Sequence, residues 1–154
     1  MLVLPSHIGC VYLHGFLSSP DSKKAQELIQ YFTERNMQHQ LIIPVLDFEP
    51  VQAVTQALAA IKSLQAQQGI EQVFVMGSSL GGFYATYLSQ TESIKGVLIN
   101  PAVRPFDLFD KYLGPNKHFY DGQTYILEMK HIEQLRAMEI KQLSSPRDLL
   151  LLQQ

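Results

Sequence analysis

The segment Gly-Ser-Ser-Leu-Gly at residues 77–81 constrains the fold of this 154-residue chain more than any other. It follows an apolar run at residues 73–76 and precedes a segment at residues 83–88 with helical character. A strand that passes directly into a helix turns so sharply that only glycine fits on either side of the turn. Gly77 and Gly81 meet this need, so we expect the side chain of Ser79 to project above the end of a sheet.

A serine in this setting is typical of a nucleophile elbow and predicts acyl transfer through Ser79. A serine hydroxyl is a poor nucleophile unless a base takes its proton. A second motif, His-Gly-Phe at residues 14–16, follows the apolar run at residues 8–13. Elbow enzymes hold the oxyanion with the N–H of the residue after the nucleophile and one from an earlier loop. We therefore expect Leu80 and Phe16 to form the oxyanion hole.

The order of apolar runs and amphipathic segments predicts an α/β fold. Near-continuous apolar strands alternating with helices favour a parallel sheet with helices on both faces. We expect strands at residues 8–13, 41–43, 72–76, 97–99 and 149–152, a helix after an N-cap at Ser19 with Pro20 in its first turn, a helix at residues 51–64 closed by Gly69, and a helix after the elbow.

A change of pattern at residues 102–142 predicts a helical lid within a single domain of residues 1–154. We expect a short helical cluster at residues 106–113, a break at residues 114–116, and a helix around Leu135. Aromatic side chains in this stretch line an acyl pocket or form the core of the lid, and the sequence leaves both interpretations open. They are Phe106, Phe109, Tyr112, Phe119, Tyr120 and Tyr125.

Composition excludes several classes of function. A formal net charge of −2 offers no basic surface for nucleic acid or for a membrane. No secretory leader or apolar span is visible, so we expect a cytoplasmic protein. The single cysteine, Cys10, lies in an apolar run and is expected to be a small buried side chain. We expect no cofactor, because the chain lacks a phosphate-binding loop with its lysine and metal-spaced ligands.

Three stretches resemble the small YqiA-like esterases of the α/β-hydrolase superfamily. They are residues 12–20, residues 77–86, and the run Asn-Pro-Ala-Val-Arg-Pro-Phe at residues 100–106 with Tyr-Leu-Gly at residues 112–114. The resemblance covers essentially the whole chain. It implies that Ser79 is the nucleophile, that His14 and Gly15 shape the oxyanion loop, and that the substrates are small carboxylic esters or acyl thioesters.

The chain departs from this family at its C-terminal end. Triad partners follow the serine in the order acid, then histidine, and the sequence stops at Gln154, shortly after the last expected strand. We therefore expect a fragment or a natural truncation, without the C-terminal strand and helices. His118 and His131 are weaker candidates for a replacement base: we expect a loop residue at the first and a helix-surface residue at the second. Arg104 either orients a polar head group of the substrate or pairs with a carboxylate such as Asp107, and we favour the structural role.

A second hypothesis follows from the same departure. A hydrolase fold that has lost its base can act as a binding protein through its lid or its sheet edge. An unpaired edge strand at residues 149–152 would favour self-association. Within the enzyme class, thioesterase and perhydrolase activities stay open beside esterase activity.

Overall fold

A computed structural model describes residues 3–153. Its main sheet has the strand order β2-β1-β3-β4-β7, and every neighbouring pair is parallel. The strands are β1 (Ile8–Leu13), β2 (Leu41–Ile42), β3 (Gln72–Ser78), β4 (Gly96–Ile99) and β7 (Leu149–Leu152). The predicted strands are thus found, although β2 ends one residue earlier, β4 begins one residue earlier, and β3 extends two residues further, up to the elbow. The parallel sheet with its helices confirms the predicted α/β class.

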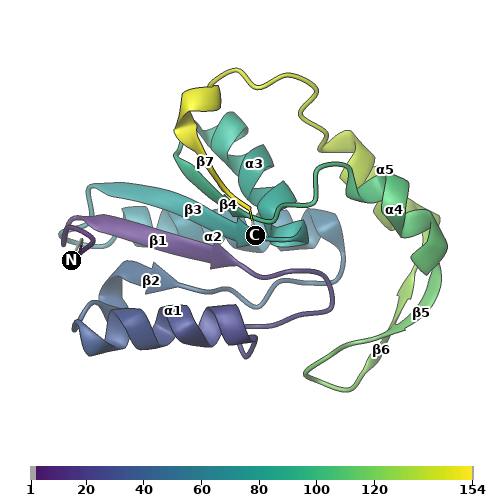
Figure 1. Cartoon of the computed structure of the whole chain (residues 1–154), viewed down its shortest axis with the longest axis horizontal. Coiled ribbons are helices and arrows are strands. Elements are labelled where there is room, and N and C mark those ends of the chain that lie inside the picture. The colour runs from purple at the N-terminus through teal and green to yellow at the C-terminus, as the bar shows by residue number, and fades with distance from the viewer. Residues whose placement is uncertain (1–2, 154) are drawn as a thin grey trace.

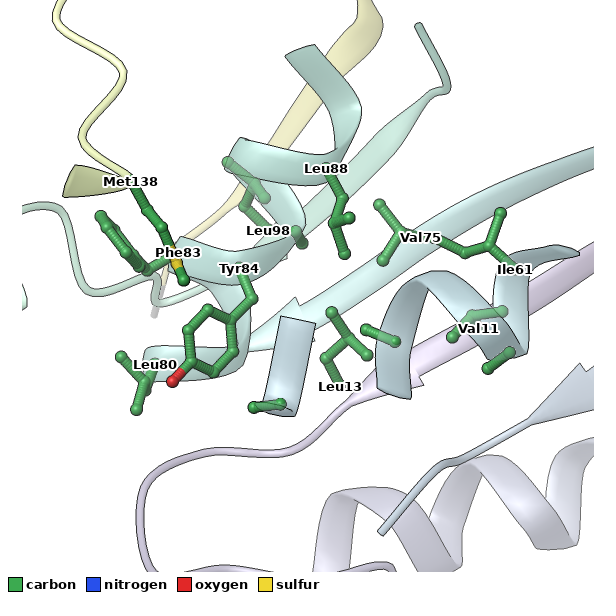
Figure 2. Packing of buried hydrophobic residues seen from close by; sticks show 14 of the residues in the cluster. Val11, Leu13, Ile61, Val75, Leu80, Phe83, Tyr84, Leu88, Leu98 and Met138 are labelled. Atoms are coloured by element: carbon green, nitrogen blue, oxygen red, sulfur yellow. The ribbon is translucent and has the colours of Figure 1, made fainter. Parts of the chain in front are cut away.

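Two helices cover one face of the sheet and build the main core. They are α2 (Pro50–Gln65) and α3 (Leu80–Glu92). Alternate strand residues such as Val11, Leu13 and Val75 point into this core and are fully buried. Figure 2 shows them meeting Leu88 of α3 and Ile61 of α2. The elbow is therefore anchored on the best-packed side of the sheet.

The other face is only partly covered. Helix α1 (Lys23–Glu34) packs there against β1 through Phe32 and Cys10, and Cys10 is fully buried as predicted. Figure 1 shows α1 on the side of the sheet away from α2. Strands β4 and β7 extend beyond it, and Leu150 and Leu152 are 57% and 45% exposed. Helices therefore lie on both faces of the sheet, as predicted, and α1 leaves β4 and β7 uncovered on this face.

Helix α1 begins later than predicted. Its N-cap is Ser22, not Ser19. The hydroxyl of Ser19 instead accepts a hydrogen bond from Asp21 N at 3.0 Å, and Ser22 N donates to the carbonyl of Ser19 at 3.1 Å. These bonds close a separate turn before the helix, because serine hydroxyls stabilise turns as readily as helix starts.

The segment at residues 102–142 lies beyond the C-terminal ends of the strands (Figure 1). It contains α4 (Pro105–Phe109), the 3₁₀ turn Asp110–Tyr112, an antiparallel hairpin of β5 (Gly114–Lys117) and β6 (Thr124–Leu127), and α5 (Met129–Ala137). The predicted break is found, because helical structure ends at Tyr112, but residues 114–116 form β5 and not a turn. Proline and asparagine are uncommon in strands, but proline is tolerated in a strand such as β5 that pairs on one side only. The role of this segment as a lid stays a prediction.

Two further 3₁₀ turns, Gln38–Gln40 and Pro146–Asp148, lead into β2 and β7. Among residues 3–153 no helix is long and apolar enough to cross a membrane.

Candidate active site

Ser79 stands at the turn between β3 and α3 with an unusual backbone. Its φ of 55° and ψ of −120° lie outside the regions that non-glycine residues normally adopt. Its N–H donates to Ile99 O at 3.2 Å, and its carbonyl accepts from Ala102 N at 2.9 Å. These bonds tie the turn to the end of β4 and the residues after it. The residue itself is exposed, so its hydroxyl is open to a reactant.

Close backbone packing explains the glycines of the elbow. A Cβ on Gly77 would collide with the carbonyl of Gly81, and a Cβ on Gly81 would collide with the carbonyl of Leu13. Gly82 has the same restriction, since its Cβ would lie 2.7 Å from Pro101 Cβ. The first turn of α3 therefore lies directly on the ends of β1 and β3, which no larger residue would allow.

A pocket of about 530 Å³ opens beside Ser79. Gly15 and Leu80 both line it, and a Cβ built on Gly15 would lie 3.8 Å from Ser79 Oγ, so the serine lies at the margin of the pocket. Phe16 lines the same pocket. The first N–H groups of a helix have no partner within it, so Leu80 N–H is available to a ligand. The structure thus brings the two expected oxyanion residues to one cavity.

His14 is buried and supports the loop. Its Nε2 accepts a hydrogen bond from Leu46 N at 3.1 Å, which places the ring proton on Nδ1, next to Gly15 O at 3.1 Å. Burial lowers the pKa of His14 and keeps the ring neutral. Because the lone pair of Nε2 is already used, His14 cannot take a proton from Ser79 in this arrangement.

His118 fastens the β5–β6 hairpin to the loop at residues 14–21. Its Nδ1 accepts from Tyr120 N at 3.2 Å and Asp121 N at 3.1 Å, so the proton lies on Nε2, which donates to Ser18 O at 2.9 Å. A triad histidine needs the reverse, with Nδ1 donating to the acid and Nε2 accepting from serine. His118 is a loop residue, as predicted, and is not arranged as a base.

His131 belongs to the start of α5. Its Nδ1 accepts from Glu128 N at 2.9 Å in a capping box, and its ring packs edge-on against Phe48. The residue is 4% exposed, so the expectation of a helix-surface position is wrong. Burial is the main cause that lowers the pKa of His131. The capping bond puts the proton on Nε2, which is again the reverse of a triad base.

The remaining histidines lie far from the elbow along the strands. His7 precedes β1 and His39 precedes β2, at the opposite end of the parallel sheet from Ser79.

Arg104 has a structural role, as predicted. Its guanidinium bonds Asp107 at 2.5 Å and Glu139 at 2.8 Å. Within residues 3–153 no group of three or more His, Cys, Asp or Glu side chains is arranged to hold a metal ion.

The aromatic residues of the segment at residues 102–142 divide between the two roles that the sequence left open. Phe106 and Phe109 are buried in the core, whereas Tyr120 and Tyr125 line the pocket. Phe119 is 74% exposed. Sequence reasoning missed the contributions of residues 45–48 and of Tyr84, which also line the pocket. Residues 45–48 follow β2 and match no recognisable motif. Tyr84 occupies a position in α3 that the sequence pattern assigns to the buried face of a helix.

Comparison with known proteins decides the family. Residues 9–154 match the uncharacterised protein family UPF0227. The chain belongs to this family. The relationship fits the resemblance predicted from residues 12–20, 77–86 and 100–114.

Solved structures place the UPF0227 chain in the α/β-hydrolase fold. Est1E from Butyrivibrio proteoclasticus is 12% identical, with a TM-score of 0.64 over 97% of this chain and 68% of Est1E. Est1E with bound ferulic acid gives a TM-score of 0.61 over 90% of this chain and 64% of that one. Alpha/beta hydrolase domain-containing protein 10 from mouse is 16% identical, with a TM-score of 0.62 over 94% and 68%. The chain spans about two thirds of the length of these structures.

Proposed function

We propose that this UPF0227 chain is a serine esterase that hydrolyses carboxylic esters or acyl thioesters through an acyl-enzyme on Ser79. The observation that carries the proposal is the exposed serine with a φ of 55°, held between glycines at a strand-to-helix turn beside a pocket. Strained backbone of this kind persists where the surrounding structure enforces it and is frequent at active sites. The fold shared with esterases such as Est1E and with lipolytic enzymes such as LipS and LipT supports the same reaction class.

The reaction proceeds in two displacements. Ser79 Oγ attacks the carbonyl carbon and passes its proton to a base, while the N–H groups of Leu80 and Phe16 stabilise the oxyanion. Collapse breaks the bond to the alcohol or thiol, which leaves with a proton from the base. Water then attacks the acyl-enzyme, and the acid product and free Ser79 are released.

The base does not come from His14, His118 or His131, because their ring nitrogens are used as described above. The proposal therefore takes the histidine and the acid from residues outside 3–153. Without them, only about 10³–10⁴-fold acceleration over the uncatalysed reaction remains.

Hydrolysis of p-nitrophenyl hexanoate tests the proposal. Ser79→Ala should lower kcat at least about 10³-fold in a form of the protein that holds the complete triad. Ser78→Ala, one residue earlier, should stay within about tenfold, since the side chain of Ser78 bonds Tyr12 and not the reactant. Equal activity of wild type and Ser79→Ala would contradict the proposal.

A second function is favoured by one specific observation. The ring nitrogens of His14, His118 and His131 already form hydrogen bonds within the protein, so none of them accepts a proton from Ser79. In the 154-residue form the pocket then binds acyl compounds without turning them over. Saturable binding of a hexanoyl compound together with undetectable hydrolysis would favour this function, and rapid turnover would exclude it.

A further inference from the structure

Tyr84 has an unused hydroxyl at the pocket. It follows Leu80 by four residues on α3, so both side chains lie on the same face of the helix. Tyr84 is 2% exposed, and both residues line the pocket. Figure 2 shows the hydroxyl directed towards Leu80. It therefore lies on the side of the helix that carries the expected oxyanion donor.

This hydroxyl has no hydrogen-bond partner within residues 3–153. Buried tyrosine hydroxyls normally have one. The oxygen is not sealed in the core either. Ser22 Oγ is the one enclosed side-chain oxygen or nitrogen without a partner in the described part of the chain. The Tyr84 hydroxyl is therefore reachable from the pocket and is available to a bound molecule.

The phenol is a reliable donor at neutral pH. Burial, and to a smaller extent the negative charge of Asp47, raise the pKa of Tyr84 above its usual value. A protonated phenol can donate to a hydroxyl or carbonyl oxygen and can accept from an O–H or N–H group.

The charges around the pocket are of one sign. Asp21, Asp47 and Asp121 line it, and none of the lining residues is lysine or arginine. Within residues 3–153 neither Asp21 nor Asp47 forms an ion pair with a lysine, arginine or histidine. The carboxylate of Asp121 lies 3.3 Å from Nδ1 of His118. Two carboxylates without an ion pair, with Asp121 as a third on the same wall, raise the energy of any anion in the cavity.

We propose that Tyr84 is a substrate-binding residue that hydrogen-bonds a neutral polar group on the non-reacting part of the ester, in a pocket whose carboxylates exclude anionic substrates. This inference rests on the proposed function, since it concerns the same pocket. It narrows the substrate class to neutral or cationic esters with a polar group beyond the carbonyl. It also disfavours acyl thioesters of highly anionic carriers.

Binding to the Ser79→Ala protein tests this independently of catalysis. The ligands are 4-nitroanilides of hexanoic and 6-hydroxyhexanoic acids, and binding is followed by calorimetry or NMR titration. Adding Tyr84→Phe should weaken the 6-hydroxyhexanoyl anilide about three- to tenfold, the value of one hydrogen bond, and the hexanoyl anilide less than about twofold. Equal effects on the two ligands, or no effect on either, would overturn the role of Tyr84. Removing an unpaired hydroxyl should leave thermal unfolding unchanged, so misfolding is not the expected outcome.

The charge rule has its own ligand pair. The adipic monoanilide should bind at least about fivefold more weakly than the 6-(trimethylammonio)hexanoyl anilide at low salt. Asp47→Asn should reduce this ratio and preserve the bond from Glu49 N to the side-chain oxygen. Glu92→Gln, an exposed charge at the end of α3, is the matched control and should not reduce it. Equal or tighter binding of the anion would overturn exclusion by charge.

If the anilides do not bind as expected but an acylating or phosphonylating reagent still labels Ser79, this inference is wrong and the proposed function still holds. The two claims can therefore be tested separately. Absence of binding by every anilide would overturn the inference as well.

Discussion

At the scale of single residues, the elbow requires glycines, because there is no room for a Cβ atom at residues 77 and 81. Gly81→Ala would force a methyl group against the carbonyls of Leu13 and His14. Backbone cannot yield as a flexible side chain does, so we expect a loss of about 3 kcal/mol or more in the free energy of unfolding. Urea denaturation measures it, and Gly15→Ala, whose added Cβ would meet no atom closer than 3.4 Å and whose φ is not positive, is the control for substitution of glycine alone. A loss below about 1 kcal/mol for Gly81→Ala would contradict the close approach.

The buried histidines predict a pH dependence of stability. Burial lowers the pKa values of His14 and His131 in the folded chain, whereas in the unfolded chain they titrate near about 6.5. The unfolded state therefore binds more protons below that pH, and the free energy of unfolding should fall as the pH drops from about 7 towards 5. His131→Gln keeps an acceptor for Glu128 N and should make the slope shallower. A constant or rising stability over this range would contradict the burial.

Much of the candidate site could be predicted at this scale because its restrictions are local. The spacing of Gly77, Ser79 and Gly81 encodes a turn, and a turn is specified by a few neighbouring residues. Tyr84 and Asp47 could not be predicted, because they meet only after α3 and the loop following β2 have folded onto one another. The actual bonds of His118 also depend on residues a hundred positions away.

At the scale of elements, the strands of the main sheet could be predicted from their apolar runs, because continuous apolar residues are typical of strands in a parallel sheet. The β5–β6 hairpin could not be predicted. Strand β5 contains glycine, proline and asparagine, and pairs with β6 outside the main sheet. Its structure depends on docking to the loop at residues 14–21, where Phe119 N donates to Leu17 O at 3.1 Å. Local propensity cannot report such a contact.

This docking gives a prediction for the hairpin. His118→Ala removes the bond to Ser18 O and the acceptor for Tyr120 N and Asp121 N. We expect amide hydrogen exchange at Phe119 to become about tenfold faster or more, with little change in exchange at β3. His39→Ala, at an exposed position, is the control. Unchanged exchange at Phe119 would show that the histidine does not hold the hairpin.

At the scale of the whole molecule, the sheet ends at an edge. Within residues 3–153 strand β7 pairs only with β4, and Leu150, Leu151 and Leu152 are 57%, 54% and 45% exposed. An unpaired apolar edge is a template for another strand. A second copy can pair its own β7 antiparallel about a two-fold axis and continue the sheet across both molecules.

We therefore predict self-association that depends on β7. Sedimentation at rising concentration should show a species larger than the monomer, and Leu150→Lys should weaken the association at least about tenfold. Val51→Lys places the same charge at an exposed position on α2 and should leave it unchanged. A strictly monomeric wild-type chain would contradict this prediction.

The central claim is that Ser79 is the nucleophile of a hydrolase, and labelling by a fluorophosphonate followed by peptide mapping tests it most directly. The account predicts one adduct, on Ser79, which is absent from Ser79→Ala and retained in Ser78→Ala, and slow labelling, because His14, His118 and His131 are not arranged as a base. Labelling of a different residue, or equal labelling of the Ser79→Ala protein, would contradict it.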